Sequence, residues 1–255
     1  MTDRDDTKDV FCLIGSRKGI CIENCLAKLD MFCKYDAYPK YDRAGYEHLD
    51  EYDRFQRVLL TVTNGQMMAR TSRKAWEPFL ERPLPFLAEL PRHVDLVESS
   101  DEDYQNARQK LHNCYIAITT VSGITDMAAS KMLYLKRPRL VAISDSYVRE
   151  ALDILKPSIR SDPRNAAFYT AQALSVSDAV RATGKYNFNS LEYFQKNLSP
   201  LEISKARIVD ILIWVDMAVG NGHPNWSKWA EENVWPSIAL QIRGTKSHLT
   251  KEQDY

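Results

Sequence analysis

Apolar residues recur every three or four positions along most of the chain, the spacing that places them on one face of an α-helix. Residues 144–155, for example, carry Val148, Ala151, Leu152 and Leu155 at this spacing. Residues 101–119 begin with acidic side chains, which favour a helix N-terminus, before their apolar positions begin. The pattern predicts helices at residues 52–70, 101–119, 126–135, 144–155, 166–183, 201–219 and 226–241.

Patterns typical of strands are rare in this chain. Only residues 10–14 and 139–143 form short apolar runs of strand length. Prolines cluster between residues 76 and 92, and the sequence Gly-Asn-Gly-His-Pro at residues 220–224 is a strong stop signal. We therefore predict a mainly α fold.

Composition limits the class of protein. The 255 residues are 44% hydrophobic, enough for a substantial core, and 34 basic residues balance 34 acidic ones. A polar, acidic N-terminus predicts no signal peptide, and Asp210 and Asp216 interrupt the most apolar run, residues 208–219. We expect a soluble, cytoplasmic protein without membrane contact or cofactor, in which any nucleic-acid binding depends on local positive charge.

Five cysteines are present, an odd number that argues against a secreted disulfide framework. Cys12, Cys21, Cys25 and Cys33 lie near the N-terminus, at spacings that do not form the two close pairs usual for zinc. We expect buried thiols, with Cys21 and Cys25 on one helix face and Cys114 in the core, and no metal site.

Residues 116–149 carry the main chemical signal. A predicted helix runs into a turn at Gly123, and a short helix follows from Asp126. The N-terminus of such a second helix attracts phosphate, although Gly123 also suits an ordinary helix C-terminus. No acidic residue lies between Met127 and Ser144, and the basic ones there are candidate phosphate contacts or a solvated loop. They are Lys131, Lys136, Arg137 and Arg139.

This segment resembles the helix-hairpin-helix DNA glycosylase superfamily. The resemblance rests on residues 121–133, VSGITDMAASKML, and on Asp145 in DSYV, 18 residues after Met127. The segment is also similar to a group of bacterial proteins of unassigned function that carry KRPRL followed by an aspartate. The sequence departs from the superfamily pattern where Ser122 replaces proline, Thr125 replaces the second glycine and Tyr147 replaces histidine.

The resemblance implies a monofunctional enzyme, because Met127 occupies the position where bifunctional members have a nucleophilic lysine. Asp145 would stabilise the developing oxocarbenium ion and help water attack, as carboxylates do in glycoside hydrolysis. Gly123, Ile124 and Thr125 would offer backbone contacts to DNA. From its position alone, Asp145 would be a helix N-cap, and one carboxylate can both cap and catalyse.

The candidates for a base pocket each also have an ordinary structural role. Asn64 and Gln66 would fill the gap left by a flipped base or line its pocket, but solvent-facing amides are the more common case. Tyr147 would form a pocket wall or simply pack in the core. The resemblance also implies two helical lobes around a cleft, one of residues 50–138 and one of residues 1–49 and 139–255.

The function implied is a DNA N-glycosylase that excises a modified or damaged base. Two alternatives remain open at this point. One is a non-catalytic helix-hairpin-helix protein that binds nucleic acid, which the departures at Thr125 and Tyr147 favour. The other is a helical interaction protein in which Asp145 only caps a helix.

Overall fold

A computed structural model describes residues 9–13, 19–34, 84–92, 94–119, 126–143, 146–154, 165–183, 186–197 and 203–220. Helices dominate these residues, as the sequence pattern predicted. The elements are strands β1 (Val10–Leu13) and β2 (Ile20–Glu23) and helices α1 (Cys25–Lys34), α6 (Leu84–Glu89), α7 (Asp101–Thr119), α8 (Asp126–Lys136), α9 (Ser146–Ala151), α10 (Ala166–Thr183), α11 (Tyr186–Asn197) and α12 (Lys205–Gly220). None of these helices is long and apolar enough to cross a membrane.

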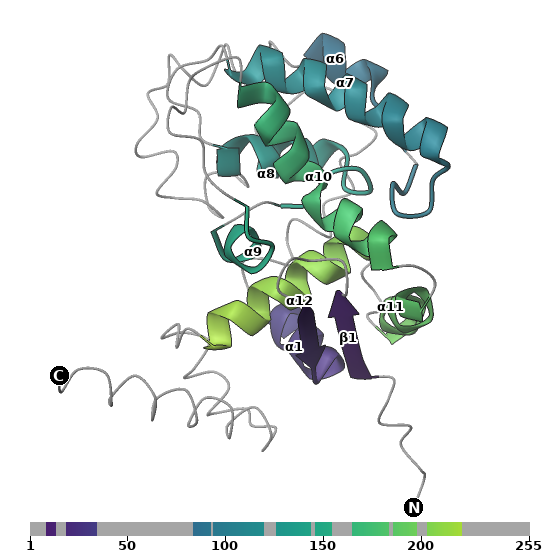
Figure 1. Ribbon diagram of the computed structural model, residues 1–255, viewed down its shortest axis with the longest axis vertical. Helices are drawn as coiled ribbons and strands as arrows, with labels where there is room; N and C mark the ends of the chain where they lie inside the picture. Colours follow the sequence, from purple (N-terminus) through teal and green to yellow (C-terminus); the bar gives the residue numbers. More distant parts are fainter. Residues whose placement is uncertain are drawn as a thin grey trace, which may run out of the picture.

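The buried side chains form two hydrophobic cores. The α7 core is built from α6, α7, α8, residues 140, 141 and 143, and the first half of α10. The α12 core is built from β1, β2, α1, α9, α11, α12 and the second half of α10. Figure 1 shows the two groups of elements one above the other, with α10 running from one to the other. Helix α10 therefore joins the cores, with Leu174 buried in one and Val176 in the other.

This division differs from the lobe boundary expected at residue 138. Residues 140, 141 and 143 and the first half of α10 pack with α7 and α8, whereas Ala142 packs in the α12 core, so the α7 core continues well past that boundary. Of the lobe expected at residues 50–138, residues 50–83 lie outside the described part of the chain, as does the helix expected at residues 226–241.

Helix α7 has the bounds that its sequence predicts. Ser100 caps its N-terminus, because the hydroxyl accepts the N–H of Asp103 at 3.1 Å and donates to the Asp103 carboxylate at 2.8 Å. One face of the helix is buried in the α7 core at a spacing of three or four residues. The buried residues are Tyr104, Ala107, Leu111, Cys114, Tyr115 and Ile118.

Helix α9 is shorter than the predicted 144–155, and the reason lies at its C-terminus. Asp153 adopts a left-handed backbone conformation with φ of 54°. The N–H of Ile154 then bonds back to the carbonyl of Arg149 at 2.8 Å, the six-residue closure of a Schellman motif. Apolar spacing continues to Leu155, but the helix stops at Ala151.

The strand predicted at residues 139–143 is wrong. After Arg137 the chain makes a turn, in which the N–H groups of Leu140 and Val141 both bond to the Arg137 carbonyl. The N–H of Ile143 bonds to a side chain, the carboxylate of Asp210, rather than to another strand. These residues are apolar because they are buried between helices, which a short apolar run alone does not distinguish from a strand.

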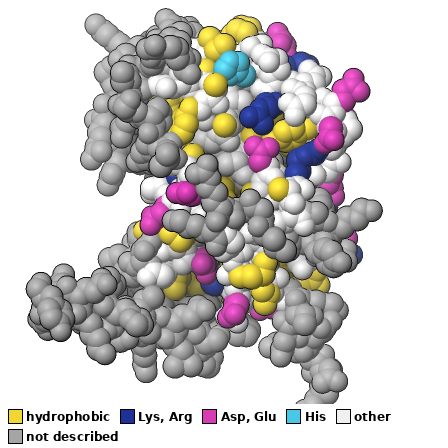
Figure 2. All heavy atoms as spheres, viewed as in Figure 1, with side chains coloured by type: hydrophobic (Ala, Val, Ile, Leu, Met, Phe, Trp, Pro, Cys, Tyr) yellow, Lys and Arg dark blue, Asp and Glu magenta, His cyan; other side chains and the backbone are white. Residues whose placement is uncertain are grey.

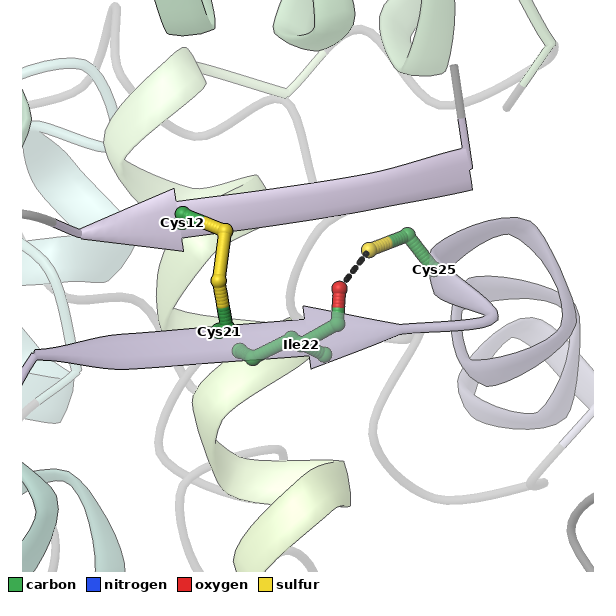
Figure 3. Close-up of a disulfide and its surroundings, with 4 residues drawn as sticks. All are labelled: Cys12, Cys21, Ile22 and Cys25. Carbon is green, nitrogen blue, oxygen red and sulfur yellow. Dashed lines mark hydrogen bonds between the residues drawn. A yellow bond between two sulfur atoms is a disulfide. The ribbon is translucent and has the colours of Figure 1, made fainter. Parts of the chain in front are cut away.

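The described sheet is an antiparallel hairpin in which β1 pairs with β2, and its two faces differ. Phe11 lies opposite Ile22, and both point into the α12 core. On the other face Cys12 lies opposite Cys21, and a disulfide joins them (Figure 3). The expectation that all five cysteines are thiols is therefore wrong, because strand pairing brings these two Cα atoms to 4.1 Å.

Cys25 does not share a helix face with Cys21, because Cys21 lies on β2 and Cys25 begins α1. Its thiol donates to the carbonyl of Ile22 at 3.2 Å (Figure 3). Burial, followed by the nearby Asp9 carboxylate, raises the pKa of Cys25 to about 12, and burial likewise raises the pKa of Cys114 to about 12. Both residues therefore remain unreactive thiols, since the thiolate is the nucleophile.

The cysteines give a direct test of this arrangement. Without reductant, the native protein should react with a maleimide at one cysteine, the partly buried Cys33. In denaturant the count should rise to three, as Cys25 and Cys114 become exposed, and after reduction it should rise to five. Intact-mass spectrometry measures each number, and five labels in denaturant without reductant would show that the disulfide does not form.

Candidate functional site

The connection between α8 and α9 leads directly into Asp145, and it lies where the two cores meet. Its described part, residues 137–143, is buried apart from Pro138 and Arg139. Asp145 itself is outside the described residues, but Ser146, the first residue of α9, follows it immediately. The contacts of the described residues on either side show how the chain is held next to this position.

Arg137 holds the start of this connection. Its guanidinium donates to the carbonyl oxygens of Leu87, Leu90 and Lys136, and its side chain is completely buried. The Leu87 carbonyl lies at the C-terminal end of α6 and also accepts the N–H of Leu90 at 3.1 Å, and Leu90 follows the helix directly. Arg137 thus ties the end of α6 to the end of α8.

Helix α12 holds the rest of the connection. Ser204, the residue before α12, donates to the carbonyl of Pro138 at 3.1 Å and accepts the N–H of Arg207 at 3.2 Å. Asp210, one turn further along, accepts the N–H of Ile143 at 3.3 Å. Asp210 on α12 and Ser204 before it therefore fix the backbone on the N-terminal side of Asp145.

The carboxylate of Asp210 also pairs with Arg207, and both side chains are buried. The Arg207 guanidinium lies 5.3 Å from the ring centroid of Phe32 on α1 and 5.0 Å from that of Tyr134 on α8. Phe32 belongs to the α12 core and Tyr134 to the α7 core, so Arg207 sits between the two. Stacking on aromatic faces and a hydrogen-bonded partner are what a buried arginine requires.

On the C-terminal side of Asp145, α9 packs against α12. Val148 is completely buried in the α12 core, and the half-buried ring of Tyr147 meets the ring of Trp214 edge-on, with centroids 6.2 Å apart. Tyr147 therefore occupies the packing role that was its ordinary alternative to a pocket wall. The α9 backbone is in this way fixed against the same helix that holds Ile143.

The predicted phosphate contacts divide into two groups. Lys131, Lys136 and Arg137 are 7%, 0% and 0% exposed, respectively, so the interpretation of this run as a basic surface is wrong for them. Buried cations of this kind serve internal partners, as Arg137 serves three carbonyls. Arg139 is exposed, so burial does not argue against a phosphate contact at this residue. Gly123, Ile124, Thr125, Asn64 and Gln66 lie outside the described residues.

Arg207 and Asp210 did not enter the sequence-based site, although the sequence held a signal for them. Acidic residues inside an otherwise apolar helix indicate buried ion pairs, because an unpaired buried charge is too costly. Asp210 pairs with Arg207, and Asp216 accepts from the buried Lys28 at 2.7 Å. Within the described ranges, no group of His, Cys, Asp and Glu side chains is arranged to hold a metal ion.

Residues 30–217 match the model of a protein family described as a family of unknown function (DUF6308). The chain belongs to this family. No curated protein and no solved structure matches the chain. The DUF6308 match begins inside α1 and ends inside α12, so it includes the whole connection that leads to Asp145 and excludes the hairpin with its disulfide.

The two arginines of the connection permit a matched stability test. Arg137→Met should lower the free energy of unfolding by about 3 kcal/mol or more, because it removes a buried charged donor from three carbonyl oxygens. Arg139→Met removes the same charge from an exposed position and should change it by less than about 0.5 kcal/mol. Urea denaturation followed by circular dichroism measures both, and equal losses would contradict the assigned role of Arg137.

Proposed function

We propose that this protein hydrolyses the N-glycosidic bond of a modified or damaged base in DNA, with Asp145 as the catalytic carboxylate. The observation that carries the proposal is the anchoring of the chain on both sides of this residue. Asp210 holds the N–H of Ile143, and α9 packs on α12 through Val148. Electrostatic catalysis requires a charge whose position is fixed before the reaction, and a rigid backbone supplies this.

The order of the elements also supports the proposal. Helix α7 is followed after six residues by the short helix α8, and the connection then leads through Asp145 into α9. This is the order that the resemblance to helix-hairpin-helix glycosylases implies. In the proposal, the backbone of Gly123, Ile124 and Thr125 and the side chain of Arg139 contact DNA phosphates. Lys131, Lys136 and Arg137 have no part in it, because they are buried.

The proposed reaction needs only water as the second reactant. The bond between C1′ of the sugar and the base nitrogen breaks, and its electron pair leaves with the base. The carboxylate of Asp145 stabilises the positive charge that develops on the sugar, and it accepts a proton from the water that forms the new bond to C1′. The target base has to leave the helical stack before this step.

Asp145→Asn separates catalysis from helix capping, since asparagine caps a helix about as well as aspartate. The variant should fold and bind DNA normally but lose about 100-fold or more of its base-release rate. The matched control is Glu150→Gln, which neutralises an exposed carboxylate on α9 and should retain full activity. Released bases are measured by mass spectrometry, and abasic sites by alkaline strand cleavage, on duplexes that carry a panel of modified bases.

The results of this experiment also separate the alternatives. Full activity of Asp145→Asn would exclude the proposed mechanism. DNA binding without base release from any duplex by the wild-type protein would favour a non-catalytic DNA-binding protein. Absence of DNA binding at low salt would favour a helical interaction protein.

Arg139 gives a second test, which concerns binding alone. Arg139→Met should weaken duplex binding and reduce the slope of log affinity against log salt concentration by about 1, as expected for the loss of one phosphate contact. Fluorescence anisotropy at several salt concentrations measures this slope. An unchanged slope would remove Arg139 from the proposed interface.

A further inference from the structure

A polar groove lies between α7 and α10, away from the connection described above. Its volume is about 230 Å³, and its described lining consists of α7 side chains and two residues of α10. The α7 side chains are spaced at three or four residues and so share one face of the helix. The lining residues are Gln105, Arg108, Gln109, His112, Ala167 and Thr170. Figure 2 shows basic and histidine side chains on the helical part of the surface above the middle of the molecule.

The hydrogen bonds of Thr170 indicate that the Nδ1 atom of His112 carries a proton. The Thr170 hydroxyl donates its one proton to the carbonyl of Ala166, at 2.7 Å. Its oxygen also lies 3.3 Å from Nδ1 of His112, so it must accept there and Nδ1 must be the donor. The imidazole is thereby held in one orientation by α10, and its Nε2 atom is the ring nitrogen left for a ligand.

Arg108 supplies a positive charge to the groove. Its guanidinium lies 3.8 Å from the carboxylate of Asp178, and both side chains are about 40% exposed. An ion pair at this distance and exposure is weak, and Asp178 also accepts the hydroxyl proton of Tyr104. Arg108 can therefore exchange Asp178 for an anion in the groove at small cost.

The remaining polar lining adds hydrogen-bond donors. Gln105 and Gln109 each carry an amide NH₂ group, of which Gln109 directs one N–H to Asn113 at 3.4 Å. None of the described lining residues is acidic. A cation and two amides on one face suit a small oxyanion with several acceptor oxygens. Nε2 of the imidazole is an acceptor when Nδ1 carries the proton, so it suits the hydroxyl of a protonated phosphate. The volume fits a phosphate group rather than a whole nucleotide.

We infer that the groove between α7 and α10 binds a phosphate group. The phosphate belongs either to the backbone of a DNA strand or to a free phosphate ester. The inference that the phosphate belongs to DNA rests on the proposed function, whereas the inference that the groove binds a phosphate group does not. From His112 to Thr119 the α7 axis advances about 10 Å, and the chain then continues to the proposed DNA contacts at Gly123, Ile124 and Thr125.

The first measurement uses inorganic phosphate and ¹H–¹⁵N NMR of the full-length protein. Saturable shifts should be confined to amides of residues 105–112 and 167–170. Arg108→Gln should weaken the binding about tenfold, and Thr170→Val, which keeps the shape but removes the hydroxyl that orients His112, should weaken it about threefold. Lys110→Gln removes the same charge from a different face of α7 and should leave it unchanged.

Absence of saturable shifts, or equal effects of Arg108→Gln and Lys110→Gln, would overturn the inference. Unfolding curves of each variant show that the fold is retained. If Arg108→Gln does not fold, the Thr170→Val result against wild type decides the question.

The second measurement identifies the source of the phosphate. If it is DNA, Arg108→Gln should also weaken duplex binding and lower its salt slope by about 1. If duplex binding is unchanged while phosphate binding is lost, the ligand is a free phosphate ester. Failure of the wild-type protein to bind DNA would overturn the proposed function but leave the phosphate site standing.

Discussion

The buried ion pair between Arg207 and Asp210 is the interaction on which the joint between the two cores depends. Removing two charges from water is costly, so such a pair persists only when its remaining hydrogen-bonding positions are filled. Asp210 fills one with the backbone N–H of Ile143, and Arg207 places its guanidinium on the rings of Phe32 and Tyr134. The pair is therefore less a source of stability than a means of fixing how α1, α8 and the connection to α9 meet.

Helix α12 is the element that makes this joint possible. Its first nine residues, 205–213, are all buried, so it has almost no solvent-facing side and must satisfy its charges internally. Lys205 pairs with Glu98 before α7 and lies 3.9 Å from Glu192 on α11. Asp216 pairs with Lys28 on α1. The charged residues of α12 thereby specify which elements lie next to it, which a purely apolar helix of this length would not do.

The sequence predicted those elements whose own residues determine them. Helices α7 and α10 have the predicted bounds because an apolar stripe of helical period runs through each, and Ser100 caps the start of α7. Helix α6 was missed because Pro85 reads as a break, yet proline is tolerated in the first turn, where Pro85 lies. The prediction of a strand at 139–143 was wrong. The N–H of Ile143 bonds to the side chain of Asp210, 67 residues later in the chain, and local periodicity does not reveal such a partner.

In the candidate site, too, the local sequence pattern does not reveal partners that lie far away in the chain. The run Lys136-Arg137-Pro138-Arg139 contains three cations in four residues, and charge density alone gives them one role. In the structure, Arg137 replaces the missing partners of a helix end, Lys136 is buried beside it, and only Arg139 is exposed. The partners that decide between these roles, the carbonyls of Leu87 and Leu90, are about 50 residues earlier in the chain. A run of charged residues therefore predicts an exposed surface only when no backbone carbonyl elsewhere in the chain takes one of these side chains as its hydrogen-bond donor.

The family match narrows where a shared function can reside. It covers the α7 core, most of the α12 core, the connection to Asp145 and the groove on α7, but it begins after the disulfide-linked hairpin. The hairpin contributes Phe11, Leu13 and Ile22 to the α12 core, a packing role that another apolar segment can fill. Asp210 and Arg207 lie within the matched range, and their partners on α1, α8 and the connection lie there as well. The interaction that joins the cores is therefore a property of the matched segment, and a site built on it does not require the disulfide.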